Sequence, residues 1–371
     1  MSKKIISSRL SKVDSSVIRA AFSLANNIKD PIDLSIGFPE DDTPRKIRQA
    51  GISAIKDGFT RYTPSNGIIE LRQAIAKKLA SQNDIHLSPK QVTIVPGLTT
   101  GILLIYLSIL DLGDELILSD PFFPPYRDIA LMLGAKVVYA DTFPDFQLTA
   151  ERLQPLITKK TKAIVINSPN NPSGAVYPKN ELKKIAELAK KHNLIIISDE
   201  IYEYFSYDHH HFSIGSIYHN TLTLNGFSKA FAMTGWRLGY VAGPFVLIEA
   251  INELQQYIVF SSSSIAQRAA LAALRYNPKN LTSKYRHKRD LTVKLLEEKF
   301  NVQGAQGAFY AFVSLPDGID DLLFVKRAAK EKVIILPGQV FSKHKNYIRI
   351  AYGNTKEQIE SGIKIVNSLL D

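Results

Sequence analysis

Short apolar segments alternate with amphipathic ones through the middle of the chain. The apolar segments are rich in β-branched residues and fall at 92–95, 115–119, 136–140, 163–167, 194–198, 221–225 and 238–243, with helical patterns between them, for example at 68–80, 99–110 and 180–191. Some are apolar on both faces, as Ile195, Ile196 and Ile197 illustrate, and such strands need cover on both sides. The alternation predicts an α/β fold with a mostly parallel central sheet and helices on both faces.

The last hundred residues follow a different pattern. Helical patterns at 261–275, 284–300, 320–331 and 356–370 are mixed with alternating strands at 308–314 and 347–351. This mixture is typical of a smaller α+β domain. We expect residues 1–45 to join it, because the proline-containing stretch at 31–44 lacks the sheet-core pattern. The prediction is a large domain at 46–275, and a small domain made of the N-terminal arm, 1–45, with 276–371.

Composition narrows the possible classes of protein. The chain has 371 residues, of which 45% are hydrophobic and 22% charged, and this mixture excludes disordered and fibrous architectures. It has no cysteine, which excludes disulfides, a thiolate nucleophile and cysteine-based metal centres. The longest apolar run, 101–110, ends at Asp111 and is too short to span a bilayer. We therefore expect a soluble, cytoplasmic protein with no membrane partner.

The net charge of +11 points to anionic ligands, either nucleic acid or small molecules. The basic residues are spread along helical segments and mixed with glutamate, for example at 181–191 and 284–299, so we expect no nucleic-acid partner. The first twelve residues contain Lys3, Lys4, Arg9 and Lys12 and no acidic residue. A transit peptide and a solvated N-terminal arm both fit this pattern, and we favour the arm. No apolar region typical of a secretory signal follows.

Ligands of an open parallel sheet bind beyond the carboxyl ends of its strands. The residues that follow the predicted strands include a glycine loop, an aromatic ring, an amide, a carboxylate, a phenol and an amine: Gly97, Leu98, Thr99, Phe123, Asn171, Asp199, Tyr202, Ser228 and Lys229. A glycine loop at a helix start can bind phosphate, although a plain strand–helix turn looks the same. A lysine near cations such as Arg237 can have a lowered pKa and can form a Schiff base, whereas an isolated lysine is usually a solvated surface residue. The dinucleotide and Walker A glycine patterns are absent from the sequence.

Several segments, in order along the chain, resemble the class I/II pyridoxal-phosphate-dependent aminotransferases of fold type I. Residues 228–239 resemble the cofactor-lysine segment of that family, Asn171-Pro172-Ser173-Gly174 its Asn-Pro-x-Gly, and Asp199-Glu200-Ile201-Tyr202 its Asp-x-x-Tyr. Segments 34–37, 61–62 and 347–350 also match, so that the resemblance covers about residues 10–370. It implies the fold type I architecture, pyridoxal 5'-phosphate as cofactor, and ping-pong transfer of an amino group between an L-amino acid and a 2-oxo acid.

The resemblance also implies roles for individual residues. Lys229 would bind the cofactor as a Schiff base and shuttle a proton, Asp199 would keep the ring nitrogen protonated, and Tyr202 would hydrogen-bond the ring oxygen. Arg349 would bind the substrate α-carboxylate, together with Asn171 and the Gly37 backbone. The other cofactor contacts would come from Gly97, Leu98, Thr99, Phe123, Asn171, Ser228 and Arg237. Tyr62 would reach the phosphate of a neighbouring subunit, which implies a homodimer.

Two other functions fit parts of the sequence. A carbon–sulfur β-lyase of the same fold would use nearly the same residues, and release of pyruvate and thiol would reveal it. A cofactor-sensing DNA-binding regulator would suit the basic charge, but it needs a helix-turn-helix module, and we expect none because the aminotransferase-like pattern begins near residue 10. Among amino donors, aspartate, aromatic and aliphatic amino acids all stay open.

Three further features could carry chemistry. His209, His210 and His211 are consecutive and so do not share one face, and we predict a solvated surface loop and no metal site. The serine run at 261–264 is expected to begin a helix and to line the substrate pocket. Trp236 is expected to pack beside Arg237.

Overall fold

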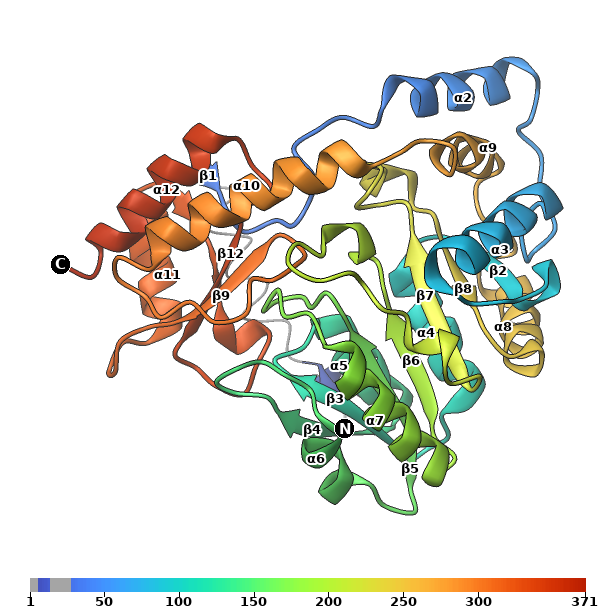
Figure 1. Ribbon diagram of the computed structural model, residues 1–371, viewed down its shortest axis with the longest axis horizontal. Helices are drawn as coiled ribbons and strands as arrows, with labels where there is room; N and C mark the ends of the chain where they lie inside the picture. Colours follow the sequence, from blue (N-terminus) through green and yellow to red (C-terminus); the bar gives the residue numbers. More distant parts are fainter. Residues whose placement is uncertain (1–5, 14–27) are drawn as a thin grey trace.

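The computed structural model describes residues 6–13 and 28–371, and within them a seven-stranded sheet forms the centre of the larger part of the molecule (Figure 1). Its strand order is β2-β8-β7-β6-β5-β3-β4. Only β8 runs antiparallel to its neighbours in this sheet, so the prediction of a mostly parallel sheet is confirmed. The strands are β2 (Val92–Val95), β3 (Glu115–Asp120), β4 (Lys136–Asp141), β5 (Thr161–Asn167), β6 (Ile195–Asp199), β7 (Thr221–Gly226) and β8 (Gly239–Ala242).

Helices cover both faces of this sheet, as the apolar strands predict. Ile195 and Ile197 face one side, where they pack with α4 (Leu98–Ile109), α5 (Pro124–Leu133) and α8 (Phe245–Ile258). Ile196 faces the other side and packs with α7 (Lys179–Lys191). The alternation of neighbouring isoleucines between two cores explains why this strand has no polar face.

The remaining elements of the larger part surround the β2 edge or connect strands. At that edge α2 (Arg45–Lys56) packs against α9 (Ser264–Ala273), and α3 (Ile69–Asn83) packs against α9 and β2. The helix predicted at 261–275 begins at Ser264 because the Ser263 side chain caps it, accepting a hydrogen bond from the Ala266 N–H. The short helices of the described chain are α6 (Ala150–Leu153) and the 3-10 helices η1 (Ser8–Lys12), η2 (Pro89–Gln91), η3 (Gln154–Leu156), η4 (Glu203–Phe205), η5 (Ile214–Ser216), η6 (Thr234–Trp236) and η7 (Gly338–Val340), of which η7 belongs to the smaller part.

A smaller α+β part follows in the chain. Its antiparallel sheet has the order β11 (Leu336–Pro337), β12 (Tyr347–Ala351), β9 (Tyr310–Ser314), and its helices are α10 (Lys279–Leu296), α11 (Asp321–Lys330) and α12 (Lys356–Ser368). The strand β1 (Ile32–Asp33) pairs with β10 (Val333–Ile334), which places residues 32–33 against this part, whereas η1 contacts α5 of the larger part. The exact division at 46–275 stays a prediction, and part of the N-terminal arm lies outside the described residues.

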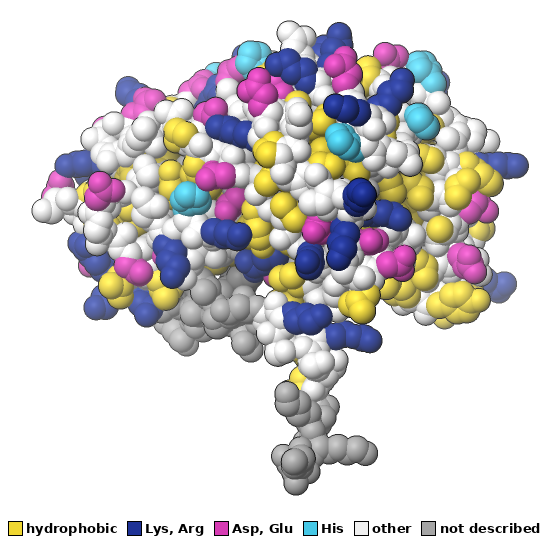
Figure 2. Space-filling view, turned by 90° about the horizontal axis from the view of Figure 1, so that it is seen from below, with side chains coloured by type: hydrophobic (Ala, Val, Ile, Leu, Met, Phe, Trp, Pro, Cys, Tyr) yellow, Lys and Arg dark blue, Asp and Glu magenta, His cyan; other side chains and the backbone are white. Residues whose placement is uncertain are grey.

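The surface and the helices bear on possible partners. On the face shown in Figure 2, Lys and Arg side chains are scattered among Asp and Glu and form no single basic patch. Within the ranges described above, no helix combines the length and the apolar character that crossing a membrane requires.

Candidate active site

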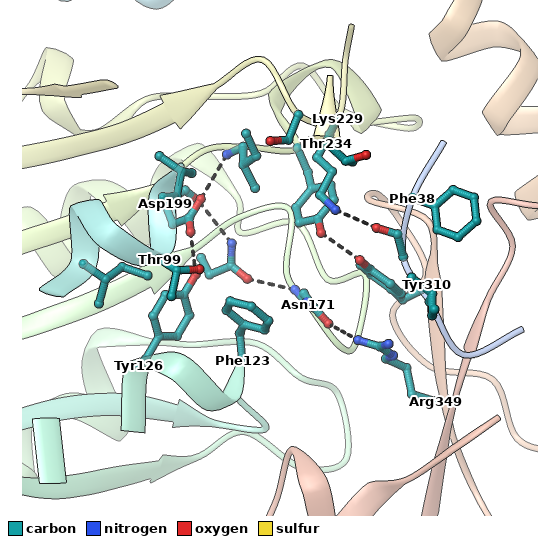
Figure 3. A pocket seen from close by; sticks show the side chains of 18 of the residues that line it. Phe38, Thr99, Phe123, Tyr126, Asn171, Asp199, Lys229, Thr234, Tyr310 and Arg349 are labelled. Atoms are coloured by element: carbon teal, nitrogen blue, oxygen red, sulfur yellow. Dashed lines mark hydrogen bonds between the residues drawn. The ribbon is translucent and has the colours of Figure 1, made fainter. Parts of the chain in front are cut away.

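A cavity of about 430 Å³ lies beyond the carboxyl ends of the parallel strands (Figure 3). It brings together most of the predicted site residues, which come from loops far apart in the sequence: Gly37, Leu98, Thr99, Phe123, Asn171, Asp199, Tyr202, Ser228, Lys229, Arg237 and Arg349. Residues not anticipated from the sequence also line it, among them Phe38, Tyr126, Thr234 and Tyr310. Convergence at one edge follows from the topology, because parallel strands all end there.

The Lys229 amine lies at the centre of the site's polar contacts. Its Nζ donates a hydrogen bond to the Gly37 carbonyl oxygen at 2.6 Å, and it lies 5.8 Å from the centre of the Tyr202 ring. Burial lowers the pKa of Lys229 to about 8, and the positive charges of Arg349 and Arg237 act in the same direction. A neutral amine is therefore accessible near physiological pH, which a solvated surface lysine would not offer.

Asp199 ends β6 and is buried with its carboxylate in the cavity wall. Tyr126 donates a hydrogen bond to Asp199 Oδ2 at 2.7 Å, and the Ile201 N–H donates to Oδ1 at 3.1 Å. Burial raises the pKa of Asp199 to about 6, although both hydrogen bonds oppose that shift. A cationic group bound beside this carboxylate would favour its charged form and lower the pKa again.

Tyr202 and Tyr310 form a pair of buried phenols, with 2.8 Å between their hydroxyl oxygens. Tyr310 also explains the glycine at 37. A Cβ atom there would stand 1.8 Å from the Tyr310 hydroxyl oxygen, so only glycine allows this contact. The Tyr202 hydroxyl thus belongs to a chain of contacts that runs to the segment carrying Gly37.

Arg349 is buried in the middle of β12 and is therefore not a surface arginine on an exposed face of the strand. Its Nη1 donates a hydrogen bond to Asn171 Oδ1 at 2.9 Å, and its Nη2 donates to the Ser35 carbonyl. The guanidinium lies between the rings of Tyr310 and Phe341, 4.6 and 4.4 Å from their centres. The two hydrogen bonds use two of the five N–H groups of the guanidinium, and its Nε is buried without a hydrogen-bond partner.

The opposite end of the cavity is suited to an anion. Gly97 precedes α4 with a φ of +85°, and a Cβ there would stand 2.4 Å from Arg237 Nη2. Glycine therefore lets the guanidinium approach the N-terminus of α4, where free N–H groups add positive potential. Leu98, Thr99 and Ser228 line the same cavity.

Tyr62 does not join this cavity. Its side chain is 84% exposed and contacts the ring of Phe260, with 4.7 Å between ring centres. The serine run at 261–264 begins α9, as expected, but it does not line the cavity, because Ser262 and Ser264 instead bond the backbone carbonyls of Ile94 and Phe59.

The prediction that all three histidines at 209–211 are solvated is wrong for His211. Its side chain is only 10% exposed, because the loop folds back and places Nε2 at 3.0 Å from Glu200 Oε2. Glu200, Glu203 and His211 are close enough together to hold a metal ion. However, Lys78 forms an ion pair with Glu203, and Ser213 donates to Glu200, so these carboxylates already have partners.

Comparison with known proteins identifies the family. The sequence model described as "Aminotransferase class I and II" matches residues 29–366. The aspartate aminotransferase of Pyrococcus abyssi is 38% identical and the aromatic-amino-acid aminotransferase 2 of Thermococcus litoralis 37% identical, each over 98% of this chain and 98% of the relative. The structure of a Thermus thermophilus aspartate aminotransferase with maleate has a TM-score of 0.94 at 34% identity, covering 99% of this chain and 100% of that one.

The chain therefore belongs to the class I and II aminotransferase family. The predicted fold and activity are confirmed: the protein is a pyridoxal-phosphate-dependent transferase that moves an amino group between an amino acid and a 2-oxo acid. The comparisons support this activity over the carbon–sulfur lyase alternative.

The cavity also fits pyridoxal phosphate on its own chemistry. The cofactor needs a site for its phosphate, an acid near its ring nitrogen and an amine for its aldehyde. The N-terminus of α4 with Arg237, the Asp199 carboxylate and the Lys229 amine provide these groups within one cavity, whose lining includes Leu98 and Thr99 but not Gly97 itself. Arg349 also lines this cavity, and its guanidinium keeps N–H groups beyond those bonded to Asn171 and Ser35.

Proposed function

We propose that Lys229 is the catalytic lysine of this aminotransferase. The observation that carries the proposal is its amine, whose pKa is lowered to about 8 in a cavity that also contains Asp199, Arg237 and Arg349. When bound, pyridoxal phosphate supplies an aldehyde for the amino group and an electron-withdrawing ring. Lys229 Nζ, once neutral, would accept the proton from the substrate α-carbon and deliver it to the former aldehyde carbon of the cofactor.

The other residues of the cavity hold the reactants in place. Asp199 keeps a proton on the ring nitrogen, and Tyr126, which donates to Asp199, fixes that carboxylate. Tyr202 and Asn171 would donate to the ring oxygen, and Phe123 would cover the face of the ring. Gly97, Leu98, Thr99, Ser228 and Arg237 would bind the phosphate. Arg349, with Asn171 and Gly37, binds the α-carboxylate common to every amino-acid substrate.

A direct experiment is the transfer of an amino group from an L-amino acid to 2-oxoglutarate. The wild-type protein is expected to transfer it, whereas Lys229→Ala is expected to fold, to bind the cofactor without a covalent bond, and to lose the activity. Lys284→Ala is a matched control, because Lys284 lies outside the cavity in exposed ion pairs with Glu40 and Asp41. Full activity of Lys229→Ala would contradict the assignment.

We also propose that the protein is a homodimer in which Tyr62 reaches the phosphate bound by the partner. The exposure of Tyr62 and of neighbouring apolar side chains supports this, since Phe260 is 52% and Tyr257 84% exposed. Mixing inactive Lys229→Ala and Tyr62→Ala chains is expected to restore activity in hybrid dimers, each with one intact site. A monomer by light scattering would contradict the proposal.

Because its substrates are free metabolites, we propose a cytoplasmic location, which cell fractionation would test.

A further inference from the structure

The positive charges of the cavity are few, and each has a role. Among the described residues that line it, the basic side chains are Lys229, Arg237 and Arg349. In the proposed function these serve the covalent bond, the phosphate and the α-carboxylate. A substrate whose side chain carries a second carboxylate would find no further cation in this lining.

The wall beside the reacting position is apolar. Because Lys229 Nζ contacts the Gly37 carbonyl, a substrate α-carbon near Nζ lies beside the segment Ile36–Gly37–Phe38, the apolar wall. Figure 3 shows Phe38 next to this contact. Ile36 and Phe38 both line the cavity, yet they are 41% and 42% exposed. Large side chains with that much uncovered apolar surface gain free energy when a ligand removes the surface from water.

The electrostatics of the same segment also oppose an acidic side chain. Two residues beyond Phe38 the chain continues into Glu40 and Asp41. The basic side chains that contact these two residues, Lys284 and Lys288, form ion pairs with them. A carboxylate held against the apolar wall would lose water and gain no counter-ion from these neighbours.

We propose that the preferred amino donor has a large apolar side chain, aromatic or branched aliphatic, which packs on Ile36 and Phe38. The inference rests on the proposed function, because it takes Arg349 as the α-carboxylate site and Lys229 as the reacting amine. It selects among the donor classes that the sequence leaves open.

Binding of non-reacting acids to the holoenzyme tests the inference without turnover. Isothermal titration calorimetry with 3-phenylpropionate and with succinate compares a phenyl group with a second carboxylate. We expect 3-phenylpropionate to bind about tenfold more tightly or better, a ratio within reach of apolar pocket contacts. Single-turnover rates with L-phenylalanine, L-leucine and L-aspartate should follow the same order. Equal or tighter binding of succinate, or faster reaction of aspartate, would overturn the inference.

Two substitutions at Phe38 sharpen the test. Phe38→Ala should weaken the binding of 3-phenylpropionate by about tenfold. Propionate, which lacks the ring, should bind as it does to the wild-type protein. Phe38→Arg should move the preference toward succinate, whereas Leu323→Arg, which adds the same charge at an exposed position on α11 outside the cavity, should not. Equal losses for both acids in Phe38→Ala, or no change of preference in Phe38→Arg, would contradict the role of the apolar wall. A wild-type protein that takes up no cofactor and transfers no amino group would instead refute the proposed function itself.

Discussion

The amine of Lys229 and the carbonyl oxygen of Gly37 lie 2.6 Å apart, although 192 residues separate them in the chain. Lys229 follows β7 of the central sheet, and Gly37 lies on the segment that follows β1, which pairs with the smaller part. The contact thus joins the two parts of the molecule at the reacting position. Because the carbonyl accepts from the amine, it helps to orient Nζ in the cavity.

The lowered pKa of Lys229 predicts how cofactor uptake depends on pH. Only a neutral amine attacks an aldehyde, and burial beside Arg349 and Arg237 brings the pKa from its usual 10.5 to about 8. The amine is protonated below that value, so the rate at which cofactor-free protein takes up pyridoxal phosphate should rise through pH 8 and then level off. Stopped-flow absorbance measures this rate. A midpoint near pH 10.5 would show that the cavity does not lower the pKa of the Lys229 amine.

The Asp199→Ala substitution should leave the fold and the lysine–cofactor bond largely intact but slow proton abstraction. Loss of one charge-assisted hydrogen bond to the ring nitrogen is expected to cost about 1.5–3 kcal/mol, and the weaker electron withdrawal adds to that cost. The resulting fall in kcat should be about tenfold or more. A kcat within about threefold of wild type, a barrier change of only ~0.6 kcal/mol, would exclude Asp199 as the ring partner.

The Arg349→Lys substitution should lower kcat/KM for every amino donor and keto acid alike. Lysine keeps the charge but loses the planar fork that contacts Asn171 and Ser35 and lies between two aromatic rings. We expect kcat/KM to fall by the equivalent of about 1.5–3 kcal/mol with several amino acids. A loss confined to acidic donors would mean that Arg349 binds the side-chain carboxylate of the substrate and not its α-carboxylate.

The buried ion pair between Lys78 and Glu203 predicts a large effect on stability. Both side chains are 7% exposed, and Asn83 donates to the other Glu203 oxygen at 2.8 Å. Lys78→Met would leave a buried carboxylate without its cation, which typically costs about 3–5 kcal/mol. Lys184→Met is a suitable control, because Lys184 is 60% exposed and its pair with Glu181 should contribute about 0–1 kcal/mol. Urea unfolding of cofactor-free protein measures both, and similar values for the two variants would contradict the prediction.

Much of the fold could be predicted from the sequence because its strands are apolar on both faces. Because Ile195, Ile196 and Ile197 alternate between two cores, the strand appears in the sequence as an unbroken apolar run. The patterns named from the sequence do not include α2, α5 or α8. The first turn of α5 contains Pro124 and Pro125 and resembles a loop, α2 begins directly after the proline-containing stretch, and the apolar residues exposed at both ends of α8 obscure its period.

Much of the site could be predicted for another reason. Its residues fall in short motifs at strand ends, where the topology of a parallel sheet brings them together. Tyr126 and Tyr310 could not be found this way, because each is an ordinary tyrosine whose hydrogen bond to Asp199 or Tyr202 exists only after distant elements pack. His211 was misplaced for the same reason, since its partner Glu200 lies across a loop that folds back.

The most direct test of the active site is to locate the covalent bond to the cofactor. The protein loaded with pyridoxal phosphate is reduced with borohydride, which fixes a lysine–cofactor bond, and its peptides are then analysed by mass spectrometry. We expect one pyridoxyl group per chain, on Lys229. Attachment mainly at another lysine, or no attachment in protein that is otherwise folded, would contradict the assignment of Lys229.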